Sequence, residues 1–134
     1  MPLDAICLGA VTNELNTTLA GCRVEKVYQP DRDEIVIQTR GQGGARRLLI
    51  SIAAGTPRVH FIEAARENPA VPPMFCMLLR KHVQGAKIAA VIQPAVERML
   101  SIELDTTDEM GVPCKKHLIC ELMGKHSNVI LCGE

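Results

Sequence analysis

The stretch PPMFCMLLRKHVQG, residues 72–85, predicts one short helix around which the rest of the chain is arranged. Proline is tolerated in the first turn of a helix, because its missing N–H would have no partner there. Gly85 can adopt the left-handed conformation that ends a helix, so we expect the helix to span residues 73–83. Arg80 and Lys81 then form a cationic tip where the helix dipole favours positive charge. The side chains that we expect to pack on a sheet are Phe75, Leu78 and Leu79, with His82 at the same spacing.

The composition indicates one compact domain and excludes several classes of protein. A chain of 134 residues, of which 47% are hydrophobic, can close a real core. Its formal net charge is zero, so any binding to nucleic acid or to an anionic membrane must come from local patches. One tyrosine and two phenylalanines argue against a stacking platform for successive bases. The sequence has no secretion signal and no membrane-spanning run, which predicts a cytoplasmic protein whose six cysteines are reduced thiols.

The remaining periodicity predicts an α+β fold with two helices and about eight short, mostly antiparallel strands. A first helix is expected over residues 3–19 and a polar turn over 105–113. GQGG at residues 41–44 is typical of a hairpin tip. The predicted strands span residues 23–28, 34–40, 46–52, 58–62, 86–93, 98–104, 116–123 and 128–132. Together they predict a small β-sandwich or partly closed barrel flanked by the two helices.

Three patterns could carry chemistry, although each has a simpler structural interpretation. Cys114, His117 and Cys120 have the spacing of metal ligands, but on a strand His117 points away from the two cysteines. We therefore predict no metal site and no cofactor. Pro2 could form a Schiff base after removal of the initiator methionine, which we do not expect because proline is common at that position. Three arginines beside the hairpin tip form either a solvated cluster or a contact to a phosphate backbone: Arg40, Arg46 and Arg47.

Several stretches of the chain resemble the NFACT family, whose bacterial members have long been called fibronectin-binding proteins. The resemblance rests on residues 72–85, on Gln93 with Glu97-Arg98, on ELMGKHSNVIL at 121–131, and on the N-terminal pattern with Asp4 and Asn13-Glu14-Leu15. It runs nearly end to end and in order. Family members are several times longer, so the resemblance implies that residues 1–134 are the first part of an NFACT N-terminal domain. It also implies a fold similar to the N-terminal domain of formamidopyrimidine-DNA glycosylases.

The resemblance further implies a role in ribosome-associated quality control. Such proteins bind a large ribosomal subunit that carries peptidyl-tRNA, and they recruit charged tRNA, which is alanyl-tRNA in bacteria, for template-free tailing of the stalled chain. The ribosome catalyses the extension, so the expected protein positions tRNA and is not an enzyme. The alternatives are a fibronectin-binding adhesin, with fibronectin as partner, and a DNA glycosylase or lyase. Glycosylases carry glutamate after the proline, whereas here Leu3 follows Pro2.

The family's functional acid-arginine motif maps onto Glu97 and Arg98, although the family usually has aspartate at the first position. Family members also carry an acid near the N-terminus, which here is Asp4. From the residues themselves, the candidate phosphate contacts are Arg80, Lys81, Arg98 and Lys125.

The strand alternation places Arg98 on the inward face, so its guanidinium needs a carboxylate partner. The first helix carries two acids on its apolar arc, Asp4 and Glu14, and we expect Arg98 to pair with one of them, in the first place Asp4. Glu97 would then stay on the outer rim, free to meet tRNA.

Overall fold

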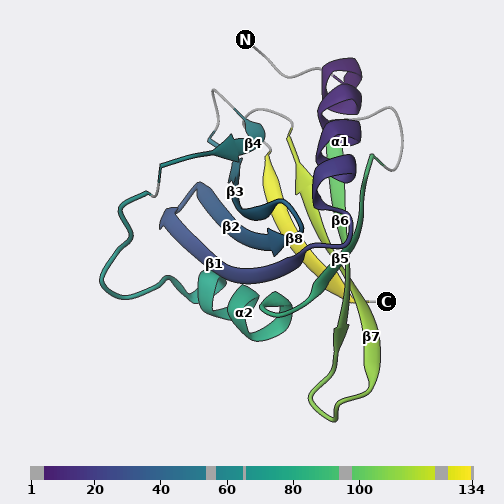
Figure 1. Cartoon of the computed structure of the whole chain (residues 1–134). Helices are drawn as coiled ribbons and strands as arrows, with labels where there is room; N and C mark the ends of the chain where they lie inside the picture. The colour runs from purple at the N-terminus through teal and green to yellow at the C-terminus, as the bar shows by residue number, and fades with distance from the viewer. Residues whose placement is uncertain (1–4, 54–56, 65, 94–97, 123–126, 134) are drawn as a thin grey trace.

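Eight strands form one mostly antiparallel sheet, and two helices pack against it (Figure 1). The computed structural model describes residues 5–53, 57–64, 66–93, 98–122 and 127–133, without the side chains of residues 5–7. In chain order the elements are α1 (Ala5–Leu19), β1 (Arg23–Asp31), β2 (Glu34–Gly41), β3 (Gly44–Ser51), β4 (Arg58–Ile62), α2 (Met74–Val83), β5 (Lys87–Ile92), β6 (Met99–Thr107), β7 (Pro113–Glu121) and β8 (Asn128–Gly133). The α+β class and the predicted elements are confirmed.

The sheet is open and continuous, with the strand order β4-β3-β2-β1-β5-β6-β7-β8. Each half is a meander, in which neighbouring strands pair with the next strand along the chain. The prediction of a sandwich or partly closed barrel is therefore wrong. The strands form one open sheet, with β4 and β8 as its two edge strands. The likeness to the glycosylase domain stays a prediction.

The two halves of the sheet are joined through a short ladder between β1 and β5. Arg23 pairs with Lys87, and Val24 exchanges backbone hydrogen bonds with Gly85 and Ala86 at 2.7 and 2.8 Å. Gly85 has a φ of 88°, as predicted for the residue that ends α2, and this conformation turns the chain into β5. Beyond this ladder the strands diverge, which leaves backbone groups of both strands without a neighbouring strand.

Side chains of the helices bond to two of those backbone groups, the Val27 carbonyl and the Val91 N–H. The guanidinium Nε of Arg80 in α2 donates to the carbonyl of Val27 in β1 at 2.8 Å, and the thiol of Cys76 lies 3.5 Å from the same oxygen. On the other side, the side-chain oxygen of Asn16 in α1 accepts a hydrogen bond of 2.8 Å from the N–H of Val91 in β5. Buried backbone groups are costly without a partner. Each helix thus covers one side of the divergence, with α2 beneath β1 and α1 beside β5 and β6 (Figure 1).

One hydrophobic core joins both meanders and both helices. Its members include side chains from β1, β3, β6, β7 and the two helices. Cys76 and Cys120 are fully buried in it as small apolar residues, and burial raises the pKa of the Cys120 thiol to about 12. The five described cysteines are free thiols. Among the described residues, no helix has the length and apolar content needed to cross a membrane.

The buried face of α2 differs from the predicted one by one position. Cys76, Leu79 and Val83 are buried, whereas Leu78 is 44% exposed and Phe75 is half-buried. The predicted face assumed that the helix lies flat on a sheet. Because α2 lies along the open edge of β1 instead, the side chains next to that edge are the buried ones.

Two further expectations are wrong. Glu14 is exposed, so it needs no cationic partner in the core. The expected polar turn over residues 105–113 is shorter, because β6 continues to Thr107 and β7 already begins at Pro113. The hairpin arms project beyond the other strands, where polar side chains can face solvent on both sides of the ribbon (Figure 1).

The two leucines of α2 allow a matched test of this packing. Leu79→Ala should lower the free energy of unfolding by about 2–5 kcal/mol, because it opens a cavity in the core. Leu78→Ala should cost well under about 1 kcal/mol, because that side chain is already half in water. Urea denaturation of the two variants measures the difference, and equal losses would contradict the placement of α2.

Substitution of two asparagines in α1 tests the hydrogen bond between this helix and the backbone of β5. Asn16→Ala leaves the Val91 N–H without its acceptor and should cost about 1–2 kcal/mol. Asn13→Ala is the matched control, because it makes the same change on an exposed position of the same helix. Hydrogen exchange at the Val91 amide should accelerate in the first variant alone.

Candidate nucleic-acid interface

The outer face of the β1–β4 meander carries most of the clustered cations. Cross-strand neighbours point to the same side of a sheet, which places Lys26, Gln38 and Arg47 in one row. Tyr28 and Val36 lie in the next row. The basic face is defined here by six cations on this side of the meander and at its margin: Lys26, Arg40, Arg47, Arg58, Arg66 and Arg80.

Two cations from different elements lie near the ring of Tyr28. Lys26 Nζ is 5.5 Å from the ring centroid, and the guanidinium carbon of Arg80 is 5.6 Å from it. Both distances fall within the range of cation–π attraction. Arg80 is held in this position by the hydrogen bond from its Nε to the Val27 carbonyl. This hydrogen bond at the edge of β1 therefore also places a positive charge beside the ring.

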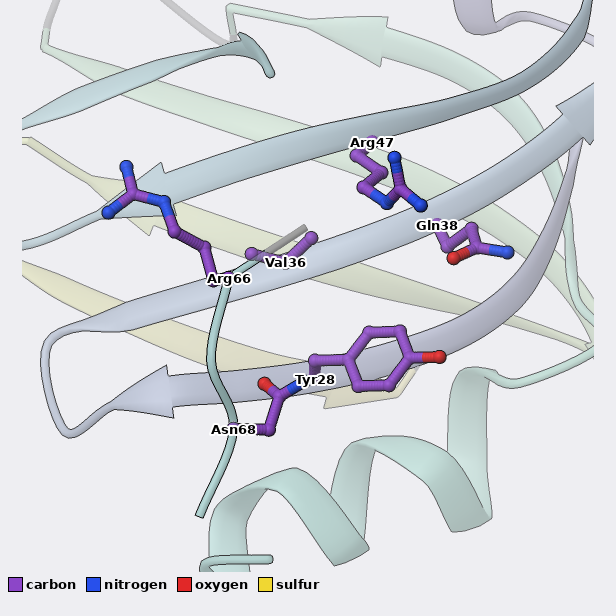
Figure 2. Close-up of a pocket in the computed structure, with 6 residues that line it drawn as sticks. All are labelled: Tyr28, Val36, Gln38, Arg47, Arg66 and Asn68. Atoms are coloured by element: carbon purple, nitrogen blue, oxygen red, sulfur yellow. The ribbon is translucent and has the colours of Figure 1, made fainter. Parts of the chain in front are cut away.

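A pocket of about 120 Å³ lies next to Tyr28 (Figure 2). Buried Val36 lines it from β2, while Gln38 and Arg47 come from β2 and β3. The segment between β4 and α2 supplies Arg66 and Asn68 from the other side (Figure 2). Arg47 holds this segment by donating a hydrogen bond of 2.8 Å to the backbone carbonyl of Glu63.

Carboxylates offset only part of the charge on the basic face. Glu25 forms an ion pair with Arg40, and the guanidinium hydrogen bond lowers the pKa of Glu25. Glu34 lies 3.9 Å from Arg58 and 3.7 Å from Arg66. These are loose pairs at a partly exposed surface, where such contacts contribute little to stability. The face therefore keeps a positive excess in a chain whose net charge is zero.

A second cationic group lies where α2 ends beside β7. Lys116 Nζ donates to Nδ1 of His82 at 2.8 Å, which requires the imidazole to be neutral. Burial, followed by the charges of Lys116 and Lys81, lowers the pKa of His82. Lys81 itself is exposed and forms an ion pair of 3.3 Å with Glu109. Of the predicted phosphate contacts in α2, Lys81 is thus exposed and paired with Glu109, whereas Arg80 is half-buried and held by Val27.

The structure describes only some of the predicted site residues. Asp4, Glu97 and Lys125 lie outside the described residues, as does Pro2. Arg98 is described, and it is exposed immediately before β6. Its expected place at the inner edge of the core is therefore wrong.

The predicted pairing of Arg98 with Asp4 or Glu14 stays a prediction, because Asp4 lies outside the described residues. Among the described residues, no ion pair joins Arg98 to Glu14. The strand pattern placed Arg98 wrongly, because alternation applies only inside the strand, and Arg98 precedes it.

The predicted phosphate contacts do not form one cluster. Arg98 precedes the first residue of β6, whereas Lys81 contacts Glu109 beyond the last residue of that strand. A strand of nine residues is about 30 Å long at about 3.3 Å per residue. Arg98 and Lys81 therefore mark two distant points on the surface.

A serine, a glutamate and a histidine meet on the outer face of β6 and β7, but not as a catalytic triad. The hydroxyl of Ser101 donates to the Glu103 carboxylate at 2.8 Å, and His117 Nδ1 contacts the same oxygen. The serine thus bonds to the carboxylate and not to the imidazole that would have to take its proton. His117 faces Glu103 while Cys120 is buried in the core, as the strand pattern predicted.

Sequence reasoning missed three cations of the basic face, Lys26, Arg58 and Arg66, and it also missed Tyr28. Lys26 and Tyr28 share one face of β1, a signal that strand alternation could have given. Arg66 carried no signal, because it lies in an irregular segment that only the tertiary structure brings across the sheet.

The lowered pKa of His82 predicts a dependence of stability on pH. The unfolded chain, with a histidine pKa near about 6.5, binds more protons than the folded protein below that pH. The free energy of unfolding should therefore decrease as the pH falls from about 7 toward the lowered pKa. His82→Gln should flatten this decrease in urea denaturation series, and parallel curves for the two proteins would contradict the environment described for His82.

Comparison with known proteins assigns the chain to a family. The protein-family model for NFACT N-terminal and middle domains matches residues 4–134. Over 131 residues the chain is 37% identical to the Rqc2 homolog RqcH of Bacillus subtilis, an alignment that covers 98% of this chain and 23% of the relative. It is 30% identical over 128 residues to the human ribosome quality control complex subunit NEMF, covering 96% of this chain and 11% of that protein.

Solved structures show the same fold. The N-terminal domain of the fibronectin-binding protein PavA from Streptococcus pneumoniae matches with a TM-score of 0.94 and 36% identity, over 98% of this chain and 50% of that one. The fibrinogen-binding protein from Staphylococcus aureus matches with a TM-score of 0.90 and 33% identity, over 100% of this chain and 47% of that one. The chain spans about a quarter of the length of the bacterial relative RqcH. On the family match and these similarities, the chain belongs to the NFACT family.

Proposed function

We propose that this chain is the first part of the N-terminal domain of a ribosome quality control factor, and that it binds tRNA and the large ribosomal subunit. The observation that carries the proposal is the similarity along almost the whole chain to RqcH and to the human ribosome quality control subunit. In bacteria the proposed factor recruits alanyl-tRNA for template-free tailing of the stalled chain. It works in the cytoplasm, where its substrate is made.

The basic face supports an RNA ligand. Lysine and arginine side chains bind RNA mainly through the phosphate backbone, and that binding needs a local excess of positive charge. The neutral net charge of the chain makes the clustering informative, because the cations of this face are not part of a generally basic surface.

The proposed role is to position RNA, without catalysis by this chain. In ribosome-associated tailing, peptide bonds form in the peptidyl transferase centre of the large subunit. A protein that holds a charged tRNA there needs complementary charge and shape, but no nucleophile of its own.

A second candidate function is binding of fibronectin, which the name of the Streptococcus pneumoniae structure favours. It is tested by surface plasmon resonance on immobilised fibronectin with protein that has been treated with ribonuclease. Saturable binding under those conditions would support it as an additional activity.

The test of the main proposal is purification of the full-length protein from cells with stalled ribosomes. Sequencing of the bound RNA and mass spectrometry should identify tRNA and proteins of the large subunit. A protein that carries neither would contradict the proposal.

Variants of Arg98 and Glu97 extend this test to single residues. Because Arg98 is exposed, Arg98→Ala should change the free energy of unfolding by less than about 0.5 kcal/mol and still reduce tRNA recovery. Lys115→Ala is the matched control, since Lys115 is an exposed cation on β7. Glu97→Ala should abolish tailing of a stalled reporter, as read from the mass of its C-terminus. Wild-type recovery of tRNA with Arg98→Ala would exclude Arg98 as a contact.

A further inference from the structure

We infer that the pocket beside Tyr28 binds one unpaired nucleotide of RNA, with the base against Tyr28 and Val36 and its two flanking phosphates at Arg47 and at Arg66, one at each arginine. The inference rests on the proposed function, because it names the part of the RNA that this face would recognise.

The pocket has an apolar wall and floor. Tyr28 is half-buried and Val36 is 3% exposed, and the two are cross-strand neighbours on the outer face. An aromatic ring beside a buried aliphatic side chain suits a planar, weakly polar group such as a base. A site for a bare inorganic anion would not need this apolar part.

Two guanidinium groups stand on the rim of the same pocket. Arg47 comes from β3 and Arg66 from the segment before α2, and their guanidinium groups lie on different sides of Val36 (Figure 2). Arg47 uses one N–H for the Glu63 carbonyl, which leaves the other donors of its guanidinium for a ligand. The distance of 3.7 Å between Arg66 and Glu34 is too long for a hydrogen bond. Both groups can therefore bind a phosphate without breaking a strong contact.

Two amides complete the lining of the pocket. The side-chain N–H of Gln38 donates to Glu25, so its carbonyl oxygen remains available as an acceptor. Asn68, which is exposed, brings a second amide from the opposite side of the pocket. Amide groups form hydrogen bonds with base edges and with the 2′-hydroxyl group of RNA.

The arrangement selects an unpaired nucleotide over a duplex. In an A-form helix the bases are stacked on each other, and no base face is available to Tyr28. One ring cannot serve a row of successive bases, and Phe61 and Phe75 pack against the core. A loop or a single-stranded end of RNA can place one base in a pocket of about 120 Å³.

The decisive measurement is binding of the full-length protein to a ten-nucleotide RNA that contains 4-thiouridine, and to an RNA duplex with the same number of phosphates. Photocrosslinks mapped by mass spectrometry should lie on peptides that contain Tyr28 or Asn68. Tyr28→Leu keeps an apolar side chain against Val36 and should fold, yet it should weaken single-strand binding about tenfold with no change in salt dependence. Tyr28→Phe should recover most of that affinity.

The double variant Arg47→Gln, Arg66→Gln tests the phosphate part. It should make the plot of log binding constant against log salt concentration less steep by about 1.4, which is about 0.7 for each of the two phosphate contacts. The double variant Lys87→Gln, Lys115→Gln removes the same charge from the other half of the sheet and should leave the slope and the crosslinks unchanged.

The outcomes separate this inference from the proposed function. If the wild-type protein binds tRNA or the large subunit but the Tyr28 and arginine variants match it, the pocket inference is wrong and the proposed function stands. If the wild-type protein binds no RNA, both fail. Loss of the crosslinks and of single-strand affinity in the Tyr28→Leu variant, with duplex binding retained, supports the pocket.

Discussion

The divergence of β1 and β5 is the constraint on which the rest of the structure depends. The two strands share a short ladder and then separate, so each has an edge whose backbone groups need partners inside the protein. α1 supplies the carboxamide of Asn16 to one edge, and α2 supplies the guanidinium of Arg80 to the other. The helices thus complete the sheet, and without them the two meanders would expose backbone groups next to the core.

The contact between α2 and the edge of β1 also positions the candidate interface. Arg80 contacts the Val27 carbonyl and also lies over the ring of Tyr28, the next residue of the same strand. The segment that leads from β4 to α2 must cross the outer face of the meander to reach the open edge of β1. Arg66 and Asn68 are carried over that face as a consequence, and they form the second side of the pocket (Figure 2).

The charge distribution follows from the layers of the fold. Both meanders turn one face to a shared core, and Lys26, Arg40, Arg47 and Arg58 of β1–β4 lie on the opposite face. A neutral chain can then still present a basic surface. The second cationic group, at the end of α2, is kept apart from Arg98 by the length of β6.

The sequence by itself determined the elements and the family. Turn residues and local periodicity act over a few positions, so GQGG predicted its hairpin, Gly85 predicted the end of α2, and β4 was predicted with its exact bounds. Only the tertiary structure decided which faces are buried and which cations meet. Leu79 is buried where Leu78 is not, because the partner of α2 is a strand edge that no local pattern reveals. Arg66 reaches Tyr28 for the same reason, since contacts between distant segments depend on how the strands diverge and not on the residues around each position.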